Sequence, residues 1–158
     1  MTEEAYGITV FCDDIRHEIN GKMTLVGCYS AELNFSGPPP GFLPNFSAFV
    51  NLRYPRGVTF EALHLSVTKV EGGEVSEIFS AETKVPPDAF LAKSDAADDE
   101  ADENMLSVVI PIQLSPLVFS APSLLKVHAK LNSGEEIRAG SLVINFPAKD
   151  DEEEHTPS

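Results

Sequence analysis

The sequence predicts an all-β protein, an antiparallel β-sandwich of about eight strands with an immunoglobulin-like or C2-like arrangement. Short segments in which apolar and polar side chains alternate follow one another along the chain, and turn residues such as Asn20-Gly21 and Gly72-Gly73 separate them. No long amphipathic helical pattern interrupts this series, which is typical of two packed sheets. The Cys, Trp, Cys pattern of true immunoglobulin domains is missing, because the chain contains no tryptophan.

The first predicted strand, residues 5–12, leads into a segment with two interpretations. Ile15 and Ile19 are four residues apart and follow Asp13, a residue type that caps helices, which fits one or two helical turns over residues 13–18. The Asn20-Gly21 pair instead indicates a two-residue type I′ turn between extended strands. We favour the extended interpretation and leave the helical one open.

The chain contains two cysteines, Cys12 and Cys28. If Asn20-Gly21 forms a two-residue hairpin turn, residues whose numbers sum to 41 are paired, so Cys12 lies diagonally beside Cys28. Two cysteines do not make a disulfide framework, and neither has a basic neighbour in sequence that would lower its pKa. We predict that both are free thiols in the core.

The longest alternating segment covers residues 22–35 and exceeds the usual strand length of about 3 to 10 residues. Gly27 is the predicted position of a bulge or bend that lets this strand serve two sheets. Residues 36–44 contain four prolines. They are predicted to form a loop, because proline has no amide hydrogen to donate.

Six further strands are predicted at residues 46–54, 60–70, 75–85, 105–114, 125–131 and 137–146. Phe49 breaks the alternation of its strand. Pro111 is predicted to point away from the core, which indicates an edge strand or a bulge. The side chains predicted to face the core are Phe46, Ala48, Val50, Leu52 and Tyr54; Leu63, Leu65 and Val67; Leu106, Val108, Ile110, Ile112 and Leu114; Leu125, Val127, Ala129 and Leu131; and Leu142, Ile144 and Phe146.

The formal net charge of −14 is concentrated in a few segments. Residues 3–4, 95–103 and 150–154 hold 13 of the 25 Asp and Glu residues, so the rest of the chain is close to neutral. We therefore predict a single domain over residues 1–148 with a flexible acidic loop at residues 93–104, followed by a disordered acidic tail at residues 149–158.

Charge and hydropathy exclude several classes of protein. No cluster of Lys and Arg offers a face for nucleic acid, and no apolar run approaches the roughly 20 residues of a membrane-spanning helix. The chain begins without a charged-then-apolar leader. We expect a cytoplasmic protein that binds neither nucleic acid nor membrane.

Residues 11–29 carry three short patterns. Phe11-Cys12-Asp13-Asp14 opens the segment, residues 18–22 give Glu-x-x-Gly-Lys, and residues 25–29 give Leu-x-Gly-x-Tyr. With these patterns the segment resembles a family of small bacterial and phage proteins, a domain of unknown function. The resemblance implies a cytoplasmic bacterial or phage origin and no assigned activity.

The densest set of side chains capable of acid/base or metal chemistry is Asp13, Asp14, His17 and Glu18. On a helix, Asp13 with His17 and Asp14 with Glu18 would each share a face, and two carboxylates with an imidazole can hold a divalent ion. Nothing later in the chain supplies an obvious remaining ligand. If the segment is an exposed loop instead, Asp13, Asp14, Arg16 and His17 are predicted to contact a protein partner.

The Gly-x-Ser-x-Gly, P-loop and His-Glu-x-x-His motifs are absent from the sequence, so we predict a non-enzyme without a cofactor. The leading hypothesis is a non-enzymatic protein-binding module, a subunit, adaptor or inhibitor in a bacterial or phage setting. Self-association is equally permitted, through the edge strand at Pro111 or through the half-apolar second face of the strand over residues 22–35. The alternative is a metal-dependent domain or hydrolase that binds calcium or another divalent ion through Asp13, Asp14 and His17, or through the acidic loop.

Overall fold

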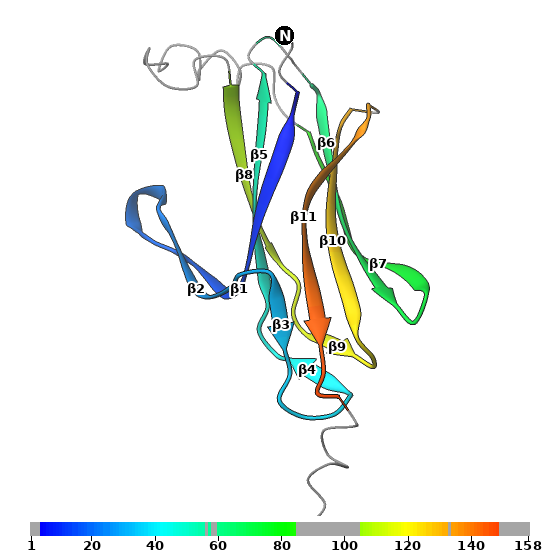
Figure 1. Ribbon diagram of the computed structural model, residues 1–158. Helices are drawn as coiled ribbons and strands as arrows, with labels where there is room; N and C mark the ends of the chain where they lie inside the picture. The colour runs from blue at the N-terminus through cyan, green and yellow to red at the C-terminus, as the bar shows by residue number, and fades with distance from the viewer. Residues whose placement is uncertain (1–3, 56, 58–59, 85–104, 133, 149–158) are drawn as a thin grey trace, which may run out of the picture.

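A computed structural model of the chain describes residues 4–55, 57, 60–84, 105–132 and 134–148, and the following description concerns these residues (Figure 1). The elements are β1 (Tyr6–His17), η1 (Ile19–Gly21), β2 (Met23–Tyr29), β3 (Glu32–Asn34), β4 (Gly41–Leu43), β5 (Ser47–Pro55), β6 (Ala62–Glu71), β7 (Glu74–Lys84), β8 (Met105–Gln113), β9 (Leu117–Phe119), β10 (Ser123–Leu131) and β11 (Glu136–Asn145). The prediction of an all-β protein is confirmed. The predicted acidic loop at residues 93–104 and the predicted tail at residues 149–158 lie outside the described residues.

The strands form two main sheets. The first has the order β2-β1-β5-β8, and the second has the order β3-β11-β10-β6-β7; β4 and β9 form a separate two-stranded ribbon. Neighbouring strands are antiparallel except β3 and β11, which run parallel. Figure 1 shows the two main sheets facing each other, with β1 of the first beside β11 of the second.

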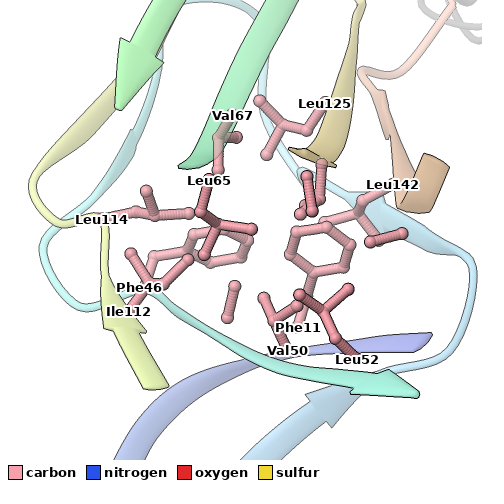
Figure 2. Close-up of a cluster of buried hydrophobic side chains, with 14 of the residues drawn as sticks. Phe11, Phe46, Val50, Leu52, Leu65, Val67, Ile112, Leu114, Leu125 and Leu142 are labelled. Carbon is pink, nitrogen blue, oxygen red and sulfur yellow. The ribbon is translucent and has the colours of Figure 1, made fainter. Parts of the chain in front are cut away.

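The core lies between the two main sheets. Figure 2 shows Phe11, Val50 and Leu52 of the first sheet opposite Leu65, Val67, Leu125 and Leu142 of the second. The predicted inward faces of β5, β6 and β10 are confirmed, since their apolar residues are almost all buried. Alternation predicts these faces well because only one side of each strand is consistently apolar.

The two sheets approach most closely where β1 crosses β11. A Cβ atom at Gly7 would lie 2.7 Å from the Cβ atom of Ala139, so only glycine permits this distance. The hydroxyl of Thr9 donates a hydrogen bond of 2.8 Å to the carbonyl oxygen of Ala139. This contact joins the sheets through polar groups at a point where the backbones leave no room for apolar side chains.

The predicted long strand over residues 22–35 is divided into β2 and β3. The chain leaves the first sheet at Tyr29 and joins the second at Glu32, so this segment does serve two sheets. Gly27 has a φ of +68°, but the register of β1 with β2 does not shift there, so the predicted bulge is absent and the strand break comes at residues 30–31. The sequence analysis predicted about eight strands because it treated β2 and β3 as one strand. It also did not identify the three-residue strands β4 and β9.

The segment over residues 13–17 is extended, because β1 continues to His17. The predicted hairpin is present, and Asn20 and Gly21 have φ values of +70° and +76°. However, Ile19 also belongs to the connection, so the amide of Glu18 donates a hydrogen bond to the carbonyl of Lys22. The predicted register is therefore wrong by one residue.

Because of this register, Cys12 is directly opposite Cys28 rather than diagonal to it. Cys12 is buried, as predicted, whereas Cys28 is exposed. The prediction of a core thiol is thus wrong for Cys28, because nothing among the described residues covers β2 on that side. The prediction of an edge strand at Pro111 is confirmed, since β8 is the last strand of the first sheet.

Candidate protein-binding surface

Residues 13–27 form a two-stranded arm, in which β1 and β2 pair with each other alone. β1 pairs with β5 from Tyr6 to Cys12, and beyond Cys12 its described partner is β2. Figure 1 shows the arm extending from the first sheet in the direction away from the second. At its tip, the side chain of Ile19 is 83% exposed.

The four residues predicted to bind a partner all lie on this arm, but not in equivalent positions. Asp14, Arg16 and His17 are exposed, whereas Asp13 is half-buried. Because β1 is extended through His17, Asp13 and His17 are separated by about 13 Å along the strand, so their helical pairing does not occur. Asp14 and His17 both line a shallow depression of about 220 Å³ that also includes Ser47, Pro111 and Gln113.

Asp13 has an intramolecular partner. The hydroxyl of Tyr29 donates a hydrogen bond of 2.6 Å to Oδ1 of Asp13. Burial, followed by the hydrogen bond to Asp13 and the negative charge of that carboxylate, raises the pKa of Tyr29 to about 12. The Asp13 side chain occupies the space that a Cβ atom at Gly27 would need. Asp13 therefore stabilises the base of the arm, and the prediction that it contacts a partner has no support from its position.

The described residues contain no group of three or more His, Cys, Asp or Glu side chains positioned to hold a metal ion. The acidic loop that was the other candidate for calcium lies outside them. Burial, together with the neighbouring Cys28 and Asp13, raises the pKa of the Cys12 thiol to about 11. A thiol with this pKa is protonated at neutral pH and is a poor nucleophile or metal ligand.

The first sheet also presents an apolar surface that the sequence analysis did not identify. Thr9 and Phe11 of β1 point toward the second sheet, so the alternate residues Tyr6, Ile8 and Val10 point outward. The outward side chains of β5 and β8 continue this surface. We call it the outer face, and its residues are Tyr6, Ile8, Val10, Phe49, Asn51, Val109 and Pro111.

Strand register places the members of the outer face in adjacent rows. Ile8 pairs with Asn51, and Asn51 pairs with Val109. The next row consists of Val10, Phe49 and Pro111. Exposed fractions of 56% for Ile8, 44% for Tyr6 and 36% for Val109 show that no described element covers these three side chains. The other members of the outer face are half-buried.

Asn51 stands in the middle of the outer face with an unpaired acceptor. Its Oδ1 atom is buried by neighbouring side chains and has no hydrogen-bond partner among the described residues. Buried carbonyl oxygens in native proteins almost always accept a hydrogen bond. Phe49 was the available sequence signal for this surface, since it breaks the alternation of its strand. Phe49 indicates an apolar surface only once the strand register places it between Val10 of β1 and Pro111 of β8.

No family model matches the sequence, and no curated protein matches it either. The family resemblance of residues 11–29 therefore stays a prediction. Among the described residues, the helical structure consists of the three-residue η1, so none of it is long and apolar enough to cross a membrane.

Proposed function

We propose that this chain is a non-enzymatic protein-binding module, built on an immunoglobulin-like or C2-like sandwich, and that its binding surface is the outer face. The observation that carries the proposal is that the apolar side chains of Tyr6, Ile8 and Val109 are exposed on this face, next to the half-buried apolar side chains of Val10, Phe49 and Pro111. Large contiguous apolar patches are uncommon on soluble monomers and mark interaction sites. The cytoplasmic bacterial or phage setting is part of the proposal, on the basis of the resemblance at residues 11–29.

The sheet geometry supports a protein as the occupant. A sheet face with side chains in regular rows packs well against another sheet at a distance of about 10 Å. Apolar side chains at the centre and charged ones at the rim are the usual arrangement of a protein interface. Here the rim is the arm, where Asp14 and His17 border the depression next to Pro111.

We propose that the occupant is a second copy of this chain. A two-fold interface requires a surface that is complementary to itself. The exposed apolar side chains of Tyr6, Ile8 and Val109 meet this requirement, because apolar contacts have no donor or acceptor sense and can be made to the same residues of another copy. Among the outward side chains of β1, β5 and β8, Asp14 is the one acid, so the surface itself does not carry the strong negative charge of the chain.

The test is the oligomeric state of the protein by sedimentation velocity, at concentrations up to about 100 µM, which would populate a dimer with a micromolar Kd. The wild-type chain is expected to dimerise. Val109→Asp places a charge on the outer face and is expected to give a monomer. Val75→Asp is the matched control, because Val75 is a valine with an exposed fraction of 68% on β7 of the other sheet.

The control variant should remain dimeric, and circular dichroism should show that both variants are folded. A wild-type monomer over the whole concentration range would overturn the proposed self-association. Equal dissociation of Val75→Asp and Val109→Asp would also overturn it, because the effect would then come from added charge rather than from the outer face.

A further inference from the structure

The second sheet carries a basic pocket on the side that faces away from the core. The pocket has a volume of about 380 Å³ and lies between β10 and β11. Lys126, His128 and Arg138 line it together with Ser141 and Gly140. Three basic side chains in one small pocket stand out in a chain with a net charge of −14 and 11 Lys and Arg residues in total.

A β-bulge creates this pocket. Val127 pairs with Gly140 and His128 pairs with Arg138, so Ala139 is an extra residue in β11. Gly140 has a φ of +151°, and a Cβ atom there would lie 2.8 Å from the Cβ atom of Thr9. Both the φ value and the close approach of β1 require glycine at this position. The bulge separates the two strands locally, and Gly7 of β1 contributes to the pocket lining.

The same register gathers the three basic side chains. Directly opposite residues of an antiparallel pair have side chains on the same face, so Arg138 lies beside His128. In the adjoining row Lys126 is opposite Ser141. The inward neighbours Val127 and Ala139 are fully buried or nearly so, which confirms that the basic side chains point to the outside of the sheet.

Two of the three basic side chains have no carboxylate partner among the described residues. Among the described residues, neither Lys126 nor Arg138 forms an ion pair, whereas Nδ1 of His128 lies 3.3 Å from Oε1 of Glu136. Like charges held together in a pocket repel each other, and a bound anion relieves this repulsion. The pocket therefore has the charge, the donors and the volume for a small anionic ligand.

We infer that this pocket binds a small molecule through an anionic oxygen group, a phosphate or a carboxylate. The guanidinium of Arg138 presents paired N–H donors that match either group, and Lys126 adds a second full charge. The hydroxyl of Ser141 supplies a further donor. Leu124, which also lines the pocket and is half-buried, offers an apolar contact for the rest of the ligand.

The test is an NMR titration of the ¹⁵N-labelled protein with sodium phosphate and, separately, with sodium acetate, at ionic strength held constant with sodium chloride. We expect saturable shifts of the amide signals of Gly140 and Ser141 with at least one of the two anions. Phosphate alone would assign a phosphorylated ligand, and acetate alone a carboxylate ligand. Binding of both would show that the pocket selects the shared anionic oxygen group.

Lys126→Gln and Arg138→Gln should each raise the Kd by about tenfold or more, because each removes a charge-assisted contact. Lys130→Gln is the matched control, since Lys130 is an exposed lysine on the same strand outside the pocket. Its Kd should not change. An absence of saturable shifts with either anion would overturn the inference, and so would equal weakening by Lys130→Gln.

Discussion

The hydroxyl of Tyr29 lies 2.6 Å from Oδ1 of Asp13, on the strand opposite. The ring of Tyr29 is 5.8 Å from the ring of Phe46, which is fully buried in the core. Asp13, Tyr29 and Phe46 thus form a chain of contacts from the arm to the centre of the protein. This chain explains how a two-stranded arm, which is marginal in isolation, keeps its position relative to the sheets.

Removal of the Tyr29 hydroxyl tests this connection. Tyr29→Phe keeps the ring but leaves the partly buried carboxylate of Asp13 without its donor. We expect the free energy of unfolding to fall by about 1 to 2 kcal/mol, as measured by urea denaturation. Tyr6→Phe is the control, because Tyr6 is an exposed tyrosine on the neighbouring strand β1, and the stability of this variant should change little.

The same hydrogen bond predicts that the stability of the protein decreases at alkaline pH. The phenol donates only while it is protonated, and its pKa is raised from the ordinary value of 10.0 to about 12 in the folded protein. The stabilisation is therefore fully present below pH 10 and is lost as the pH rises from 10 to about 12. Burial raises the pKa of Tyr54 as well, so a phenolate absorbance titration should show two late-titrating tyrosines, of which Tyr29→Phe removes one. The persistence of both in the variant would contradict this assignment.

Gly27 tests the local geometry of the arm. Its φ of +68° is unfavourable for other residues, and a Cβ atom there would collide with the Asp13 carboxylate. We expect Gly27→Ala to destabilise the protein by about 1 to 2 kcal/mol or more in a thermal or urea unfolding experiment. Gly37→Ala should have little effect, because no atom lies within 4 Å of the added Cβ. Equal stability of the two variants would show that the bend at Gly27 is not required.

Much of the fold follows from the sequence, and the exceptions have a physical cause. The inward faces of β5, β6 and β10 are predictable because their opposite faces are mostly polar. β1 is different, because Ile8 and Val10 on one side and Phe11 on the other are all apolar. Only the packing of Phe11 against Phe46 shows which side faces the core. The short strands β4 and β9 have three residues each, too few for a periodic pattern.

The candidate surface was only partly predictable for the same reason. The sequence identified Asp14, Arg16 and His17 as a polar, exposed group on the arm. The outer face, in contrast, combines residues from three strands that are distant in sequence. Their alignment depends on the register of Asn51 with both Ile8 and Val109, which no local pattern in a single sequence specifies.

Glu71 provides a further test. It is the last residue of β6, and its side chain contacts the loop before β10. Its Oε2 atom accepts hydrogen bonds of 3.0 Å from the amide of Ser120 and the hydroxyl of Ser123, and Lys69 lies 3.8 Å from Oε1. Burial acts to raise the pKa of Glu71, but these hydrogen bonds and the lysine charge together lower it. We expect Glu71→Gln to destabilise the protein by about 1 to 2 kcal/mol at neutral pH.

The sign of the pH dependence follows from the lowered pKa. The carboxylate stabilises the fold above its ordinary pKa of 4.5, and this contribution is lost as the pH falls through the lower pKa of the folded state. The stability difference between wild type and Glu71→Gln should therefore shrink in acid. Glu77→Gln, an exposed control on β7, should show no such difference. If Glu71→Gln lowered the free energy of unfolding by the same amount at every pH, the result would contradict the role of the Glu71 carboxylate in these hydrogen bonds.

The two cysteines should react at very different rates. Cys12 has an exposed fraction of 0%, and its raised pKa of about 11 leaves roughly one molecule in a thousand as thiolate at pH 8. Cys28 is directly opposite but exposed. We expect iodoacetamide to modify one thiol per folded chain, identified as Cys28 by peptide mass, and both thiols after denaturation. Cys28→Ser should abolish the fast reaction. Rapid modification of Cys12 in the folded variant would instead show that the first sheet opens at the base of the arm.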